Sequence, residues 1–178
     1  MIFYTLNLKN KTMKISFTLL AILVVLSVVI PFLIFVFKGL NSISKTKQKA
    51  ENLIKSSNYK YEKTEVWNNK FIGITKDKTV FTYIHFKDEN TIYKNINVSE
   101  IQSCESISNY KTDRDKVTRL KNLDLKIVFK SNNKAPLLLC FYDTNEGFIE
   151  DYESQRIDNW ETMLTTEINK TDTVKKAS

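Results

Sequence analysis

An uninterrupted apolar run near the amino terminus is the strongest pattern in the chain. Ile15 to Phe37 reads ISFTLLAILVVLSVVIPFLIFVF and contains no charged residue. A helix of this length, rising ~1.5 Å per residue, reaches about 34 Å and exceeds the ~30 Å hydrocarbon core of a bilayer. The run therefore predicts a transmembrane helix through Ile15, Leu20, Leu26, Pro31 and Phe37, in which Pro31 is tolerated as a kink.

A cleaved signal peptide is the alternative interpretation of this run. The run is longer than the ~7–15 residues of a signal core, and no small-residue cleavage site follows it, so we expect an uncleaved anchor. The lysines after the run outnumber those before it, and the positive-inside rule then places the carboxyl-terminal part in the cytoplasm. That balance changes if translation starts at Met13 rather than Met1.

A polar segment, residues 38–66, follows the run and is expected to be a tether. Within it, Asn41–Ser57 is rich in lysine and has apolar residues at helical spacing, so both a short helix and a solvated linker are consistent with it. Lysines close to a bilayer attract anionic headgroups. The expected contacts for such lipids are Lys38, Lys45, Lys47 and Lys49.

From Trp67 onward the pattern changes to the short period of β-strands. The predicted strands are Phe71–Thr75, Thr79–Phe86, Thr91–Val98, Ile101–Tyr110, Leu123–Lys130 and Leu137–Tyr142. The charged stretch Lys111–Arg119 is consistent with a loop, a short strand or a helical turn. Because short polar turns join consecutive strands, we expect antiparallel hairpins rather than a parallel sheet.

The last element is predicted to be an amphipathic helix. Its apolar residues recur at intervals of three and four, which is typical of a helix with one buried face. They are Phe148, Ile149, Tyr152, Ile157, Trp160, Met163, Leu164 and Ile168. We expect this face to close the sheet, with Trp160, Met163 and Leu164 as the plug, and residues 169–178 to form a polar tail.

This order of elements resembles a pleckstrin-homology-like domain, here joined to an amino-terminal span as in small bacterial membrane proteins. The residues that carry the resemblance are KFIGITKDKTVFTYI (70–84), TIYKNINVSEIQSCE (91–105), LDLKIVF (123–129) and the helix around Trp160. The resemblance covers residues 67–168. It implies an antiparallel bent barrel or sandwich of six or seven strands, closed at one end by the carboxyl-terminal helix. It also implies an interaction module, since members of known role are mostly such modules.

Composition excludes some classes of function. The net charge is +7, and three lysines of the amino-terminal segment contribute to it, so the rest is too mildly basic for a nucleic-acid binder. Cys104 and Cys140 belong to no CxxC pair and are expected to be reduced core residues, with a disulfide between them as the alternative. His85 is the only histidine, and no metal-ligand spacing accompanies it.

These patterns predict a membrane-anchored protein-interaction module with no catalytic residues, metal, cofactor or small-molecule substrate. The expected partners are the bilayer and a protein of unknown identity. Exposed sheet edges are expected to accept a peptide strand. The alternative is a membrane-surface or lipid-sensing domain that uses the lysines of the tether. Added salt distinguishes the two, because lipid contacts through lysines weaken with salt and strand pairing does not.

Overall fold

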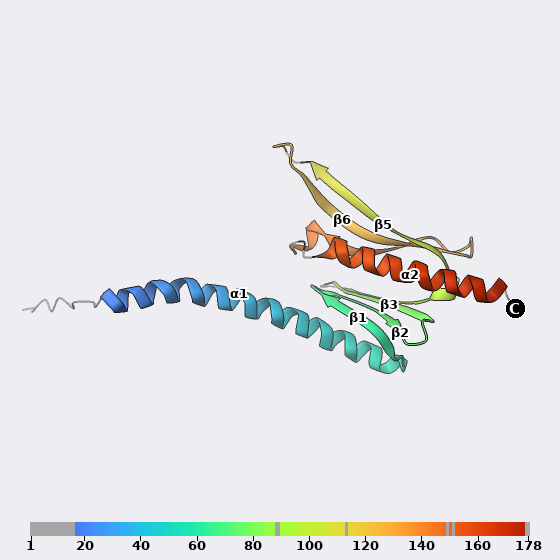
Figure 1. The fold of residues 1–178 in the computed structure, drawn as a ribbon, viewed down its shortest axis with the longest axis horizontal. Helices are drawn as coiled ribbons and strands as arrows, with labels where there is room; N and C mark the ends of the chain where they lie inside the picture. Colours follow the sequence, from blue (N-terminus) through green and yellow to red (C-terminus); the bar gives the residue numbers. More distant parts are fainter. Residues whose placement is uncertain (1–16, 88–89, 113, 149, 151, 177–178) are drawn as a thin grey trace, which may run out of the picture. The chain divides into compact units, whose positions relative to one another are not determined.

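The computed structural model describes residues 17–87, 90–112, 114–148, 150 and 152–176 of the 178-residue chain (Figure 1). The described helices and strands are α1 (Phe17–Ile54), β1 (Tyr61–Trp67), β2 (Lys70–Thr75), β3 (Val80–Phe86), β4 (Thr91–Asn97), β5 (Ile101–Thr112), β6 (Thr118–Phe129), β7 (Leu137–Asp143) and α2 (Glu153–Lys176). Short 3-10 turns η1 (Lys55–Ser57), η2 (Val98–Glu100) and η3 (Thr144–Glu146) lie between them. The chain divides into two units, Met1–Asn41 and Ser42–Ser178.

The predicted transmembrane helix is corrected by the structure. Among the described residues, no helix is both long and apolar enough to cross a membrane. Most of the predicted span lies in helix α1. Leu20, Leu26 and Pro31 lie in this helix, whereas Ile15 and the side chain of Phe37 fall outside the described part of the chain.

The helix continues without a break into the segment predicted to be a tether. Helix α1 ends at Ile54, beyond Lys45 and Lys49. Its end packs on the first sheet through Ala50, which is buried together with Phe71 and Ile84. The Oγ1 atom of Thr46 donates to the backbone oxygen of Asn68 at 2.8 Å. The end of α1 is therefore part of the second unit's packing.

The second unit contains two antiparallel sheets. One has the order β1-β2-β3-β4 and the other β5-β6-β7. The chain passes between them at η2, where Asn97 Oδ1 accepts from the backbone N–H of Ser99 at 3.0 Å. Two hydrogen bonds cross from the first sheet to β7, from Trp67 Nε1 to Phe141 O at 3.1 Å and from Tyr83 OH to Cys140 O at 2.6 Å.

The prediction of one bent barrel or sandwich of six or seven strands, closed at one end by the helix, is therefore corrected to two open antiparallel sheets and a carboxyl-terminal helix. The four-stranded and three-stranded sheets share no backbone ladder, so in the described residues the strands do not form a closed ring. Barrel closure requires continuous hydrogen bonding from strand to strand. Here side chains fill the space between the two sheets instead, and helix α2 lies against them (Figure 1).

Helix α2 supplies the centre of the core. Trp160 and Leu164 are fully buried, and Met163 packs partly buried against the same cluster. The Trp160 ring centroid lies 5.8 Å from that of Phe81 on β3, and Lys63 Nζ of β1 lies 5.1 Å from the Trp160 ring centroid. The helix reaches Lys176, so most of the predicted polar tail is helical.

Strand β1 has no counterpart among the predicted strands. Its sequence, YEKTEVW, carries three charged residues and alternates in burial along most of its length. The register places Glu65 opposite Ile72 and Trp67 opposite Lys70. Because charged residues interrupt its apolar pattern, the sequence did not predict this strand.

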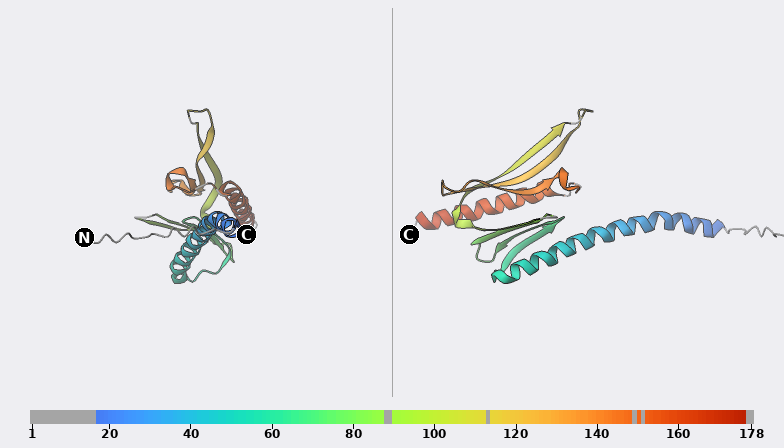
Figure 2. Two further views of the ribbon diagram at one scale, coloured as in Figure 1. Left: turned by 90° about the vertical axis from the view of Figure 1, so that its left-hand side faces the viewer. Right: turned by 180° about the vertical axis from the view of Figure 1, so that it is seen from behind.

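In the other sheet, β5 and β6 are longer than predicted, and the far end of their hairpin stands clear of the rest of the unit (Figure 2).

Candidate functional site

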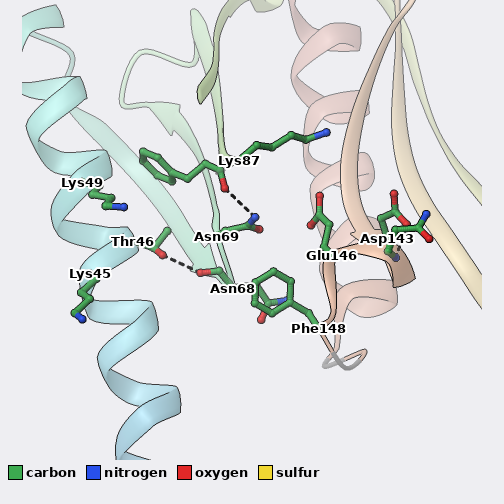
Figure 3. Close-up of a pocket in the computed structure, with 11 residues that line it drawn as sticks. Lys45, Thr46, Lys49, Asn68, Asn69, Lys87, Asp143, Glu146 and Phe148 are labelled. Atoms are coloured by element: carbon green, nitrogen blue, oxygen red, sulfur yellow. Dashed lines mark hydrogen bonds between the residues drawn. The ribbon is translucent and has the colours of Figure 1, made fainter. Parts of the chain in front are cut away.

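A cleft of about 670 Å³ opens in the second unit (Figure 3). One side is the end of α1, and the other is η3 with the residues after it. The turn between β1 and β2, Asn68 and Asn69, lies between these sides. The cleft thus joins segments that are about a hundred residues apart in the sequence, from the end of α1 to the residues after β7.

Three lysines line the cleft without a carboxylate partner among the described residues. Lys45 and Lys49 lie four residues apart on α1, a spacing that puts both on one face of a helix. Lys87 follows β3. Lys49 Nζ lies 5.9 Å from the Phe86 ring centroid, and all three lysine side chains are exposed.

A buried charge cluster lies behind this cleft. Lys70 and His85 are each 1% exposed, and both contact the carboxylate of Glu146. Lys70 Nζ donates to one carboxylate oxygen of Glu146 and also to Asn69 Oδ1 at 2.9 Å. His85 Nε2 lies 2.8 Å from the other oxygen.

The contact of His85 with Glu146 is close but poorly directed. Its distance of 2.8 Å is short enough, but Nε2 is a buried atom that no acceptor meets in hydrogen-bond geometry. The cluster joins β2, β3 and η3 through the carboxylate of Glu146.

The environment of Glu146 strongly favours its charged form. Burial alone would raise the pKa of this carboxyl, but the contacts with His85 and Lys70 outweigh burial and lower the pKa from 4.5 to about 2. A carboxylate held between two donors is already compensated. It therefore repels an anion in the cleft much less than a free carboxylate would.

Local turn chemistry holds Glu146 in place. The side chain of Asp143 accepts from the backbone N–H of Asn145 at 2.9 Å and so starts η3. Gly147 ends the turn in the left-handed region, with φ of 73°. An ordinary residue is strained there, whereas glycine is not. The sequence TNEG thus presents the Glu146 carboxylate to Lys70 and His85.

His85 and the Cys140 thiol are the side chains to consider as a base and a nucleophile. His85 is 1% exposed. Burial raises the pKa of the Cys140 thiol to about 12, which keeps it protonated and unreactive. Both cysteines are free. Within the described ranges, no group of three or more His, Cys, Asp or Glu residues could hold a metal ion.

The structure brings together only some of the residues singled out in the sequence. Lys45 and Lys49 line the cleft, whereas Lys47 is exposed and does not line it. The side chain of Lys38 falls outside the described residues. The plug residues Trp160, Met163 and Leu164 belong to the core between the sheets and do not line the cleft.

Sequence reasoning missed most of the cleft. Lys87, Asn69 and Glu146 come from three separate turns, and no motif links them. The one usable signal is the Gly147 that follows an Asp-Thr-Asn-Glu turn, since such turns hold side chains in fixed positions.

Comparison with known protein families, with curated proteins and with solved structures gave no match to this chain. The resemblance to pleckstrin-homology-like domains therefore stays a prediction.

Proposed function

We propose that this chain is a binding module without catalytic activity, and that its lysine-lined cleft recognises an anionic, phosphate-type group. The observation that carries the proposal is the arrangement of charges. Lys45, Lys49 and Lys87 face a common cleft without carboxylate partners in the described part of the chain. The one carboxylate at the back, Glu146, is compensated by Lys70 and His85.

The neutral side chains of the cleft suit the same ligand. Asn68 and Asn69 line it between the two charged sides. Asn69 Nδ2 donates to Phe86 O at 2.9 Å, and Asn68 Nδ2 donates to Glu153 Oε1 at 3.0 Å, so both amides are fixed in direction. Fixed polar groups beside exposed lysines are typical of a site that orients an anion after charge has attracted it.

Asp143 limits the strength of this site. Its carboxylate also lines the cleft and keeps the local excess of positive charge small. We therefore expect binding in the range of a weak, salt-sensitive contact, in which each lysine contributes about 1 kcal/mol. At that value two lysines account for roughly a thirtyfold change in affinity, because 1.4 kcal/mol is a factor of ten.

The test is a titration of the purified full-length chain with inorganic phosphate and with glycerol phosphate, followed by calorimetry. The double variant Lys49→Gln with Lys87→Gln is expected to lose most of the binding. Lys121→Gln is the matched control, because Lys121 is exposed on β6 and does not line the cleft. Equal affinities of the double variant and the control would refute the proposal.

A second arm separates the sources of the anion. Vesicles of phosphatidylcholine with and without phosphatidic acid are sedimented with each variant. A loss of phosphatidic-acid-dependent binding in the double variant, but not in Lys121→Gln, assigns the site to a lipid headgroup. Phosphate binding without such a difference assigns it to a soluble anion. In both cases added salt should weaken binding, since screening shortens the range of the charges.

A further inference from the structure

We propose that the free edge of β4 binds an extended peptide that carries an acidic residue, as an added strand of the first sheet. This surface lies outside the lysine-lined cleft and does not rest on the function proposed for that cleft. Three features of the second unit support it: other sheet edges are covered, the outer backbone groups of β4 point away from β3, and a groove lies beside them.

Helix α2 covers one pair of sheet edges. Arg156 Nε of α2 lies 3.1 Å from Glu65 Oε2 on β1. Glu161 Oε2 accepts from the backbone N–H of Ser106 on β5 at 2.9 Å. The edges formed by β1 and β5 thus have α2 against them, which leaves β4 and β7 as the other two edges of the sheets.

The outer backbone groups of β4 are free to pair. The bonds from Lys87 N to Asn90 O and from Val98 N to Thr79 O mark hydrogen-bonded pairs of the β3–β4 ladder. Such pairs alternate along an antiparallel ladder. The N–H and C=O of Tyr93 and Asn95 therefore point away from β3, and no described group pairs with them. An unpaired edge of this kind is a template for another strand.

A groove of about 510 Å³ lies beside this edge. One wall is β4, and the opposite wall contains the side chains of Phe129, Ala135 and Leu137. A strand added to β4 directs alternate side chains towards this wall. The groove therefore fits an apolar side chain of the added peptide.

Lys94 determines the charge of the peptide. Lys94 lies on the same face of β4 as Ile92 and Ile96, because residues two apart along a strand share a face. Those two isoleucines are more buried, whereas Lys94 lines the groove and is exposed. No carboxylate pairs with Lys94 among the described residues. An apolar strand laid across it would desolvate its ammonium group at a cost, whereas an acidic residue opposite it would form an ion pair. The neighbouring Lys134 is already paired with Glu100 at 2.5 Å.

A matched pair of variants tests the backbone part of the proposal. Asn95→Pro removes the outward N–H without removing a β3–β4 hydrogen bond, since edge strands tolerate proline at such positions. Asn95→Ala removes the same side-chain contacts with Thr82 and Tyr93 but keeps the N–H. Thermal unfolding of both full-length variants checks that each is folded.

The experiment is selection of phage-displayed random dodecapeptides on the immobilised full-length chain. Acid-containing peptides with alternating apolar residues are expected to be enriched, to bind Asn95→Ala at least tenfold more tightly than Asn95→Pro, and to be weakened by Lys94→Glu. A central Asp→Lys change in the peptide should restore binding to Lys94→Glu. Absence of enriched peptides, or equal binding by the two Asn95 variants, overturns the proposal.

The alternative occupant is the β4 edge of a second copy. Sedimentation of the full-length chain over a range of concentrations detects it. Self-association that Asn95→Pro abolishes and Asn95→Ala retains would show that copies of the chain pair through this edge, and it would overturn the proposal of a peptide partner.

Discussion

At the scale of single residues, the fold depends on a few side chains that connect distant segments. Trp160 is fully buried between the sheets. Its indole N–H is a buried group that no acceptor meets in the described residues, although Lys63 lies over its ring. Glu146 connects β2 and β3 to η3 through its two carboxylate oxygens. The first residue acts by volume and the second by charge, so their variants should respond to different conditions.

Replacing Trp160 by alanine should leave a large cavity at the centre of the core. We expect a loss of ~3–5 kcal/mol in the free energy of unfolding, the usual cost for a buried tryptophan. Urea unfolding followed by circular dichroism measures it. Trp160→Phe, which keeps most of the volume and removes the unpaired N–H, is the control and should lose much less. Equal losses would show that volume does not explain the role of Trp160.

The Glu146 cluster predicts a defined dependence of stability on pH. The pKa of Glu146 is about 2 in the folded chain and 4.5 ordinarily, so the folded state favours the carboxylate. Its contribution to stability is therefore fully present above the ordinary pKa and is lost as pH falls towards 2. Urea unfolding between about pH 5 and pH 3 should show this loss. Glu146→Gln should be less stable at neutral pH and should show a flatter profile, and an unchanged slope would contradict the assignment.

At the scale of elements, short turns set the position of the cleft. Turn η3 ends at Gly147, whose φ of 73° lies in the left-handed region. A Cβ atom added there would meet no heavy atom within 4 Å. Any cost of a side chain at this position is therefore backbone strain and not a clash.

Gly147→Ala should thus destabilise the chain by about 1–2 kcal/mol, the cost of the left-handed conformation for an ordinary residue. Gly147→Asn should cost less, because asparagine tolerates this region. Thermal unfolding ranks the two variants. If alanine and asparagine are equally tolerated, η3 is not held in this conformation in solution.

At the scale of the whole molecule, the second unit has its own core. Residues from Ser42 onward form one compact unit, which contains the end of α1, both sheets and α2. Strand β1 and Ala50 belong to this packing. A segment that begins at Trp67 lacks both.

A chain of residues 42–178 should therefore unfold in one cooperative transition, as expected for a unit with its own core. A chain of residues 67–168 should be less stable or unfolded, because β2 then becomes an edge strand and Phe71 and Ile84 lose the cover of α1. Calorimetry of the two chains decides between them. Equal melting temperatures would show that β1 and the end of α1 are dispensable.

The sequence by itself determined the elements whose pattern is local. Six of the strands and the final helix follow from apolar spacing, because period and burial are linked in a strand or helix that has one buried face. The predicted helix around Trp160 agrees with α2 from Glu153 onward. Phe148 and Tyr152 were predicted to belong to its apolar face, but both precede the helix, and Tyr152 is exposed. Strand β1 was missed because its charged residues alternate with partly buried ones.

Only the tertiary structure decided how these elements close on one another. Strand spacing does not reveal that the chain changes sheet at η2, so a closed barrel and two separate sheets were equally consistent with it. The lysine-lined cleft joins Lys49 of helix α1, Lys87 after β3 and Glu146 of η3, and no local pattern encodes such a meeting. The apolar run of α1 predicted a membrane span from hydropathy alone, whereas the described helix is not long and apolar enough for one. Local periodicity determines which side chains of a segment are buried. Long-range packing determines which other segments cover them.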